Sequence, residues 1–260
     1  PEQQRSILWN LFSEVRSIIY GRGLVTYAEI FSKLARRFSE GSNMPFDFCV
    51  VDEAQDINIA QLGFLAAISG KRPNSLFFAG DLGQRIFQQP FSWKALGVDI
   101  RGRSKTLRIN YRTSHQIRMQ ADRLLGPELS DVDGNSEERR GTTSVFNGPL
   151  PIVESQDSPE EESVFVASWL TERISEGLTP HEIGIFVRSA AELPRAKAAV
   201  GQAGLSSKVL DEHVESEIDH VSLATMHLAK GLEFRAVAVM ACDDEVMPLQ
   251  ERIETVTDDS

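Results

Sequence analysis

The spacing of apolar residues predicts two helices at the start of the chain. Over residues 4–20, apolar side chains recur at intervals of three and four, which predicts an amphipathic helix. The helix should end at a glycine, Gly21 or Gly23. A second helix is expected after Thr26, because Glu29 three residues later would complete a capping box. The chain therefore opens with a helical segment.

A different pattern of apolar residues follows, in which short apolar runs alternate with predicted helices. The runs FDFCVV at 46–51 and SLFFAG at 75–80 flank a predicted helix near 58–69, which is the spacing of a βαβ unit. Continuously apolar strands of this kind are expected to be buried on both faces of a parallel sheet. A further strand is predicted at 106–110, followed by a helix at 113–125.

The second half of the chain repeats this alternation after a polar, glycine-rich stretch at 126–149, which is expected to be a long exposed loop. A helix should begin after Ser158, with Pro159 in its first turn and Glu161 closing a capping box. Another helix is expected near 191–202. Strands are predicted at 150–155 (LPIVES), 183–187, 221–226 and 236–241. The pattern predicts an α/β fold with two parallel-sheet halves.

The net charge of −11 argues against a protein coated in basic surface for duplex DNA. The charge is uneven, however, because residues 101–112 contain five basic side chains and no acid. For this stretch, a solvated face and a phosphate-facing role both remain open. The acidic runs at 160–162, 211–219 and 243–245 are interpreted as solvated faces. The basic residues are Arg101, Arg103, Lys105, Arg108 and Arg112.

Cysteine use and hydropathy predict a cytoplasmic protein with no membrane partner. Cys49 and Cys242 lack the spacing of metal ligands and are expected to be buried thiols in a reducing compartment. No apolar run approaches the roughly 18 residues that a membrane span needs, and no secretory signal opens the chain. The chain begins at Pro1 rather than at a methionine, so we expect it to be a piece of a longer protein.

The stretch VVDEAQD at 50–56 carries the first candidate chemistry. Ligands of open parallel sheets bind beyond the carboxyl ends of the strands, where Asp52 and Glu53 are expected. An aspartate there can hold Mg²⁺ through water, because hard cations prefer oxygen ligands, and a neighbouring glutamate can deprotonate a water molecule that attacks a phosphate. Acids also cap helices, so this stretch alone is a weak signal.

Three further stretches follow predicted strands. AGDLGQRIF (79–87) contains Gln84, a neutral amide that could sense a terminal phosphate without adding charge. LRINYRTS (107–114) contains Arg112, which could stabilise charge on a transferring phosphoryl group. VSLATMHLAKGLEF (221–234) places polar side chains after a strand in the second half: Thr225, His227, Lys230 and Glu233.

In this order the four stretches resemble motifs II, III, IV and V of superfamily 1 helicases of the UvrD/Rep/PcrA type. The resemblance covers about residues 46–114 and 181–246. It implies two RecA-like parallel-sheet lobes of the P-loop NTPase type, the first incomplete. Residues 1–45 would form a helical segment, 46–98 the rear of the first lobe, and 99–260 the second lobe, truncated before motif VI.

The resemblance also implies roles for individual residues, with ATP and Mg²⁺ as cofactors. Catalytic roles would fall to Asp52 as the Mg²⁺ ligand, Glu53 as the water-activating acid, and Gln84 and Arg112 at the γ-phosphate. Asp81, Tyr111, Gly231 and Glu233 would contribute to nucleotide binding, with Tyr111 near the adenine and Glu233 on the ribose. Trp93, Thr225 and His227 would contact single-stranded DNA.

Structural alternatives remain open for four of these residues. Trp93 could be core, and Tyr111 could pack against its own helix. Thr225 could be a strand-end cap, and His227 a hydrogen-bonded turn residue.

The sequence departs from the helicase pattern in several places. No GxxxxGK[ST] phosphate-binding loop occurs, and ISGKRP at 68–73 does not replace it. The motif VI arginine is also missing, so this chain alone is not expected to hydrolyse ATP. FQQPFS before Trp93 is an insertion, and Lys94 stands where arginine is usual. The stretch between Arg112 and Val221 is too short for a large 2B subdomain.

The expected function is therefore that of a piece of an ATP-dependent DNA helicase or translocase. By resemblance it would move 3′→5′ along single-stranded DNA, or act at a junction of single- and double-stranded DNA, in repair or recombination. One alternative is a degenerate helicase core that binds DNA or protein without catalysis. Another is a translocating motor subunit linked to a nuclease.

Overall fold

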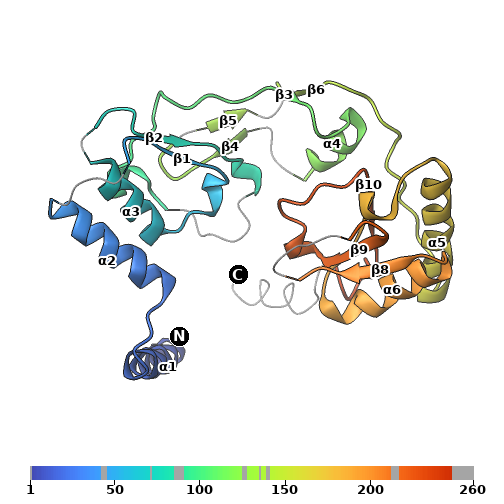
Figure 1. The fold of residues 1–260 in the computed structure, drawn as a ribbon, viewed down its shortest axis with the longest axis horizontal. Helices are drawn as coiled ribbons and strands as arrows, with labels where there is room; N and C mark the ends of the chain where they lie inside the picture. Colours follow the sequence, from blue (N-terminus) through green and yellow to red (C-terminus); the bar gives the residue numbers. More distant parts are fainter. Residues whose placement is uncertain are drawn as a thin grey trace. The chain divides into compact units, whose positions relative to one another are not determined.

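The chain forms two compact units, residues 1–151 and 152–260, and each is described by itself (Figure 1). The computed structural model describes residues 2–41, 46–70, 72–84, 91–124, 128–134, 136–138, 141–211 and 217–247. Helices and parallel strands alternate, which confirms the predicted α/β fold. The sequence predicts that the first lobe ends at residue 98 and that the second begins at residue 99. This lobe boundary stays a prediction, because the two compact units need not coincide with the predicted lobes.

Two helices open the first unit, as predicted. α1 (Glu2–Gly21) carries its apolar stripe in solvent, where Phe12, for example, is 62% exposed. α2 (Tyr27–Ser39) begins with the predicted capping box: the backbone N–H of Glu29 donates to Thr26 Oγ1, and the Thr26 N–H donates to the Glu29 carboxylate. α2 packs on α3 (Ile59–Ser69), with the rings of Phe31 and Phe64 5.5 Å apart.

A two-stranded parallel sheet lies beside α3. β1 (Cys49–Val51) pairs with β2 (Leu76–Phe78), with Cys49 opposite Leu76. Apolar residues on one face of the pair pack with Leu62 of α3 in a core cluster. On the other face, Val50 is 76% exposed and Phe77 63% exposed. The predicted burial on both faces is wrong for these strands, because only one layer of helices covers them among the described residues.

The stretch predicted as a long loop contains short strands. β4 (Glu128–Ser130) and β5 (Ser136–Glu138) form an antiparallel pair, and β6 (Thr143–Ser144) pairs in parallel with β3 (Ile109–Asn110). The loop prediction is corrected accordingly, although residues 125–127, 135 and 139–140 lie outside the described residues. α4 (His115–Ala121) is shorter than predicted at both ends: Ser114 is its N-cap, and the helix ends at Ala121 with Asp122 as its C-cap.

The second unit contains a four-stranded parallel sheet in the order β10-β7-β9-β8. Three of these strands were predicted: β7 (Ile183–Val187), β9 (His220–Thr225) and β10 (Ala236–Val239). The fourth, β8 (Ser206–Val209), has the polar sequence SSKV and gave no apolar signal. LPIVES at 150–155 forms no strand, and its Val153 is 88% exposed, so that prediction is wrong.

Helices cover one face of this sheet (Figure 1). α5 (Pro159–Ser175) starts after the N-cap Ser158, and α6 (Leu193–Gln202) follows β7. The Glu161 side chain accepts from the backbone N–H of Asp157 rather than closing the predicted box on Ser158. Leu170 of α5 is fully buried in the cluster that α5 and α6 form with the sheet.

The segment 226–234, which follows β9, packs on the opposite face. Phe234 lies against Phe186 of β7, with ring centroids 5.8 Å apart. A Cβ added to Gly184 would approach the Phe234 ring to 2.8 Å, so the ring can reach the sheet only because this residue is glycine. The glycine therefore sets the position of a segment that carries several predicted site residues.

Two remaining predictions concern the cysteines and the membrane. Cys49 is half-buried and Cys242 is exposed, so the predicted burial of both thiols is wrong. In the described part of the chain, no helix combines the length and the apolar character that crossing a bilayer requires.

Candidate functional site

Asp52 and Glu53 leave the sheet at the carboxyl end of β1. Backbone hydrogen bonding between the chains of β1 and β2 continues past these two residues. The Ala79 N–H donates to Val51 O at 2.9 Å, and the Ala54 N–H donates to Ala79 O at 2.8 Å. Both acids are exposed. Glu53 has φ 50° and ψ 40°, a left-handed conformation that costs energy for a residue other than glycine. Such strain is concentrated at functional sites, which supports a role for this turn.

Gln55 joins this turn to the one that follows β2. It lies in the short 3₁₀ helix η1 (Ala54–Asp56) and is 3% exposed. Its Nε2 donates to Glu53 Oε2 at 2.5 Å, and its Oε1 accepts from the backbone N–H of Asp81 at 3.0 Å. Gln55 stands inside the stretch VVDEAQD, but no sequence signal marked it as a site residue.

Asp81 in turn holds Gln84. The Gly83 N–H donates to Asp81 Oδ1 at 2.8 Å, and Gln84 Nε2 donates to Asp81 Oδ2 at 3.0 Å. These bonds fix η2 (Leu82–Gln84) at the end of β2 and leave the Gln84 residue exposed. The structure thus brings three predicted site residues, Glu53, Asp81 and Gln84, into one hydrogen-bonded chain through Gln55.

The chemistry of Asp52 fits a magnesium–nucleotide complex better than a metal held by protein alone. Its Oδ1 accepts from the Glu53 N–H at 2.9 Å, and the residue is exposed. Within the described ranges, no group of three or more His, Cys, Asp or Glu residues could hold a metal ion. Mg²⁺ commonly uses one or two carboxylates together with water and phosphate oxygens, and Asp52 can serve in such a set.

Trp93 lies in the core of the first unit. It is 6% exposed, and its ring packs edge-on against Phe78 of β2 with centroids 4.8 Å apart. This position agrees with the structural alternative left open for Trp93. A base could stack on this ring only after the ring had left the core, so the DNA contact stays a prediction.

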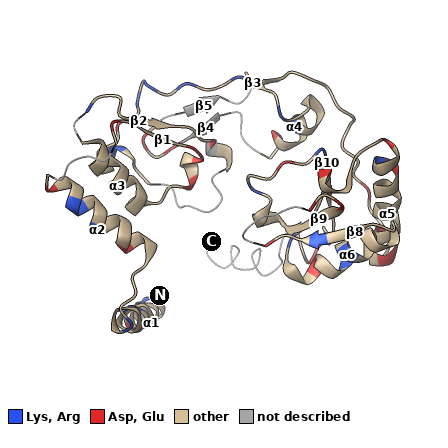
Figure 2. Cartoon of the chain, viewed as in Figure 1, with Lys and Arg blue, Asp and Glu red and all other residues tan. Residues whose placement is uncertain are grey.

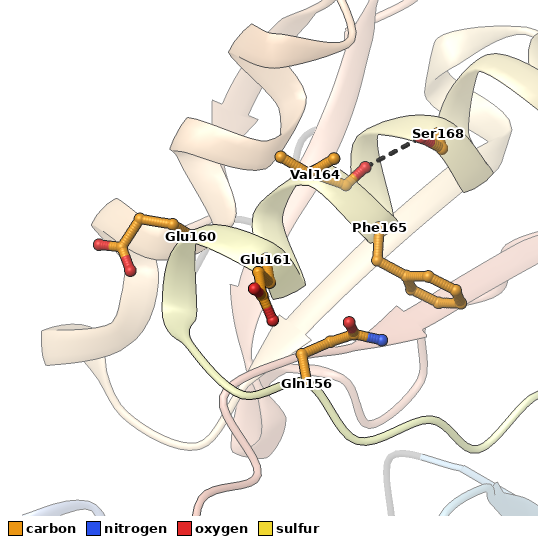
Figure 3. Close-up of a pocket in the computed structure, with 6 residues that line it drawn as sticks. All are labelled: Gln156, Glu160, Glu161, Val164, Phe165 and Ser168. Atoms are coloured by element: carbon orange, nitrogen blue, oxygen red, sulfur yellow. Dashed lines mark hydrogen bonds between the residues drawn. The ribbon is translucent and has the colours of Figure 1, made fainter.

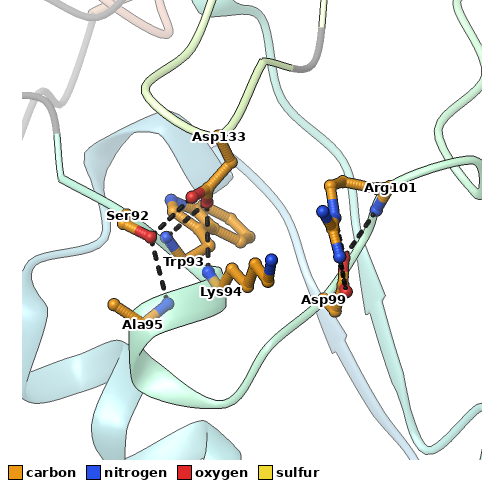
Figure 4. Close-up of polar contacts among 7 residues, drawn as sticks. All are labelled: Ser92, Trp93, Lys94, Ala95, Asp99, Arg101 and Asp133. Atoms are coloured by element: carbon orange, nitrogen blue, oxygen red, sulfur yellow. Dashed lines mark hydrogen bonds and ion pairs between the residues drawn. The ribbon is translucent and has the colours of Figure 1, made fainter.

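Asp133, in the connection between β4 and β5, caps the Trp93 turn (Figure 4). Its carboxylate accepts from the Ser92 hydroxyl at 2.5 Å, the Trp93 N–H at 2.7 Å and the Lys94 N–H at 3.1 Å. The Ser92 hydroxyl, followed by these backbone N–H groups, holds the pKa of Asp133 below its usual range. No sequence signal identified Asp133, because it stands in a stretch expected to be a loop.

Tyr111 and Arg112 occupy the turn after β3. Asn110 Oδ1 accepts from the backbone N–H groups of Arg112 at 2.9 Å and Thr113 at 3.0 Å, which fixes the turn. Tyr111 is 73% exposed, so its ring is not packed away against a helix of the described chain. Arg112 is exposed as well.

The basic stretch at 101–112 is at the surface, and Figure 2 shows basic residues along the chain that leads to β3. All five of its basic residues are exposed. Arg101 pairs with Asp99 at 2.6 Å, and Arg103 donates to Asn74 Oδ1. Their exposure leaves the stretch accessible to phosphate groups.

The second unit carries the other predicted residues at the end of β9 and in the segment that follows. Thr225 is 7% exposed, and its Oγ1 lies 3.2 Å from Nε2 of the exposed His227. Gly231 has φ +82°, which favours glycine, and Glu233 is exposed nearby in sequence. The prediction that these residues and the Glu53 network line one cleft depends on how the two units are arranged, and it stays a prediction.

A hollow of about 420 Å³ lies at the start of α5 (Figure 3). Glu160 and Glu161 line it together with Val164 and Phe165, and it contains none of the predicted site residues. The charged residues that line it, Glu160 and Glu161, are both acidic and would repel a phosphate group, so this hollow is not a candidate nucleotide site.

Comparison with known proteins identifies similarity over most of the chain. The model of the UvrD/REP helicase N-terminal domain matches residues 20–92, and the model of the UvrD-like helicase C-terminal domain matches residues 197–259. A Mycoplasma pneumoniae protein named "Probable DNA helicase" is 22% identical over 225 residues, which cover 84% of this chain and 39% of that protein. A Bacillus subtilis protein named "Putative ATP-dependent DNA helicase YjcD" is 26% identical over 149 residues, which cover 55% of this chain and 19% of that protein. The chain thus spans well under half the length of these relatives.

Proposed function

Because this chain belongs to the UvrD/Rep type of superfamily 1 helicases, we propose that it contributes part of the ATPase and DNA-binding machinery of an ATP-dependent DNA helicase or translocase. The protein would use ATP hydrolysis to move 3′→5′ along single-stranded DNA, or from a junction with duplex DNA. The full-length protein would supply the phosphate-binding loop that the 260 residues lack.

The hydrogen-bonded chain from Glu53 to Gln84 is the observation that carries this proposal. Glu53 would take a proton from the water that attacks the terminal phosphate, and Asp52 would hold Mg²⁺, which supplies charge neutralisation at the phosphates. Gln84, held by Asp81, would detect whether the terminal phosphate is present. The polar network gives each of these side chains a defined position relative to the strand ends.

Four further residues are proposed to complete the nucleotide site, as the family resemblance implies: Tyr111, Arg112, Gly231 and Glu233. Exposure of Arg112, Tyr111 and Glu233 leaves these side chains accessible to a ligand. Thr225 and His227 are proposed to contact the DNA strand, and the exposed basic stretch at 101–112 would attract its phosphates. Trp93 is proposed as a DNA contact only if its segment opens, since its ring is buried.

The direct test is Glu53→Gln in the full-length protein. We expect DNA-stimulated ATP turnover to fall at least about a hundredfold, because general-base catalysis commonly contributes 10²–10⁴-fold. Binding of a fluorescent ATP analogue should persist, since the amide preserves the shape of the side chain. Glu154→Gln, the same change at an exposed position before α5, should leave turnover unaltered.

Two results would contradict the proposal. If Glu53→Gln turned over ATP at the wild-type rate, Glu53 would not be the base. If the wild-type full-length protein bound DNA but showed no DNA-stimulated ATP turnover, the chain would belong to a binding module rather than a motor.

A further inference from the structure

The amide of Gln55 is oriented without ambiguity. The atom that faces the Asp81 N–H must be an acceptor, so Oε1 lies there at 3.0 Å. Nε2 is then directed to Glu53 Oε2, 2.5 Å away, and can only donate to it. The acceptor and the donor of the amide are therefore both hydrogen-bonded, and Gln55 is only 3% exposed. A buried amide with both ends bonded has little freedom to rotate.

The backbone after β2 approaches this amide more closely than a residue with a Cβ would allow. A Cβ added to Gly80 would lie 2.5 Å from Gln55 Oε1 and 3.1 Å from the Ala54 backbone nitrogen. The close approach lets the Asp81 N–H reach Oε1 directly. Because Asp81 also binds Gln84 through its carboxylate, the position of Gln84 is connected to that of Glu53 by three consecutive hydrogen bonds.

We infer that Gln55 is a positioning residue that holds the Glu53 carboxylate in a fixed position relative to the Asp81–Gln84 turn. This inference rests on the proposed function, since it concerns how the proposed base is placed. Glu53 is exposed, and without a tether its side chain could adopt several rotamers. A general base must stay within hydrogen-bond reach of its water, and a misplacement of about 1 Å can cost on the order of a hundredfold in rate.

Gln55→Met in the full-length protein tests this role, because methionine keeps the length of the side chain and removes both hydrogen bonds. We expect kcat for DNA-stimulated ATP turnover to fall at least about tenfold while KM for ATP stays within about twofold. Gln61→Met is the matched control. Gln61 Oε1 also accepts a backbone N–H, that of Asn58 at 2.9 Å, but this bond caps α3 and does not involve Glu53.

A second pair of changes tests the same contact from the other side. Gly80→Ala should lower kcat, because its Cβ would displace the Gln55 amide. In a Gln55→Ala background, where that amide is absent, Gly80→Ala should have a clearly smaller further effect. Additive effects of the two changes would mean that Gly80 and Gln55 act independently, and would overturn the inference.

The remaining outcomes separate this inference from the proposed function. If Glu53→Gln abolishes turnover but Gln55→Met behaves like Gln61→Met, the base assignment stands and the positioning role is overturned. A parallel loss of kcat, ATP affinity and thermal stability in Gln55→Met would show a merely structural role and would also overturn it. If Glu53→Gln leaves turnover intact, the proposed function itself fails.

Discussion

At the scale of single residues, the site depends on glycines that permit close approach. Gly184 lets the Phe234 ring rest on β7, and Gly80 lets the backbone reach the Gln55 amide. Neither position needs the left-handed conformation, so the requirement is for space rather than for backbone freedom. Both glycines stand beside stretches that carry predicted site residues, where a shift of a few tenths of an ångström would move those residues.

Gly184→Ala tests this requirement. We expect a loss of about 1–3 kcal/mol in the free energy of unfolding, because the added methyl group overpacks the Phe234 ring. Affinity of the full-length protein for single-stranded DNA should also fall, since His227 lies in the segment that the ring anchors. Chemical denaturation and fluorescence anisotropy measure the two effects.

Gly201→Ala is the control, because a Cβ at this position in α6 meets nothing within 4 Å. It should be neutral or stabilising by roughly 0.5–1 kcal/mol, as alanine is favoured in helices. Equal destabilisation by the two changes would show that the Phe234 contact is not the cause.

At the scale of elements, the connection between β4 and β5 secures the Trp93 turn. Asp133 accepts three hydrogen bonds from Ser92, Trp93 and Lys94, at the start of η3 (Lys94–Leu96). A carboxylate at this position satisfies backbone N–H groups that the 3₁₀ helix cannot satisfy itself. The connection between β4 and β5, in a stretch that the sequence predicts to be a loop, thereby fixes a residue with a predicted role in DNA binding.

Asp133→Ala should loosen the Trp93 turn. In a background where Trp9 and Trp169 are replaced by phenylalanine, the emission of Trp93 should shift to longer wavelength and become more accessible to acrylamide. Asp99→Ala should change neither property, because Asp99 pairs with Arg101 and does not bond to the turn (Figure 4). Unchanged emission in Asp133→Ala would show that packing against Phe78 alone holds the ring.

At the scale of the whole molecule, the two units have separate cores. Leu62 belongs to a cluster built from α3, the first sheet and the Trp93 turn. Leu170 belongs to the larger cluster of α5, α6 and the four-stranded sheet. Each side chain is fully buried, so each substitution removes packing from one unit.

Leu62→Ala and Leu170→Ala should each cost roughly 2–5 kcal/mol in the unit that contains the residue, through lost burial and a residual cavity. Hydrogen exchange measured by mass spectrometry should show faster exchange near β1 and α3 for the first change, and near β7 and β9 for the second. Each variant is the control for the other. Faster exchange in both units from either single change would contradict independent cores.

The sequence by itself determined the helices and the apolar parallel strands, as well as the family. Helical spacing and the Thr26 box located α1 and α2, and apolar runs located β1, β2, β7, β9 and β10. These features are local, because periodicity and capping act over a few neighbouring residues. The order of the four motifs carried the family resemblance, which the comparisons confirmed.

Only the tertiary structure decided which residues meet across the fold. The polar strand β8 pairs with β9 although its own sequence gave no apolar signal, because pairing depends on its neighbour. Trp93 is buried and Val50 is exposed for the same reason: burial depends on the elements packed against a residue, not on its own hydropathy. The bonds of Gln55 to Glu53 and Asp81 join parts of two motifs whose spacing in the sequence does not record their contact.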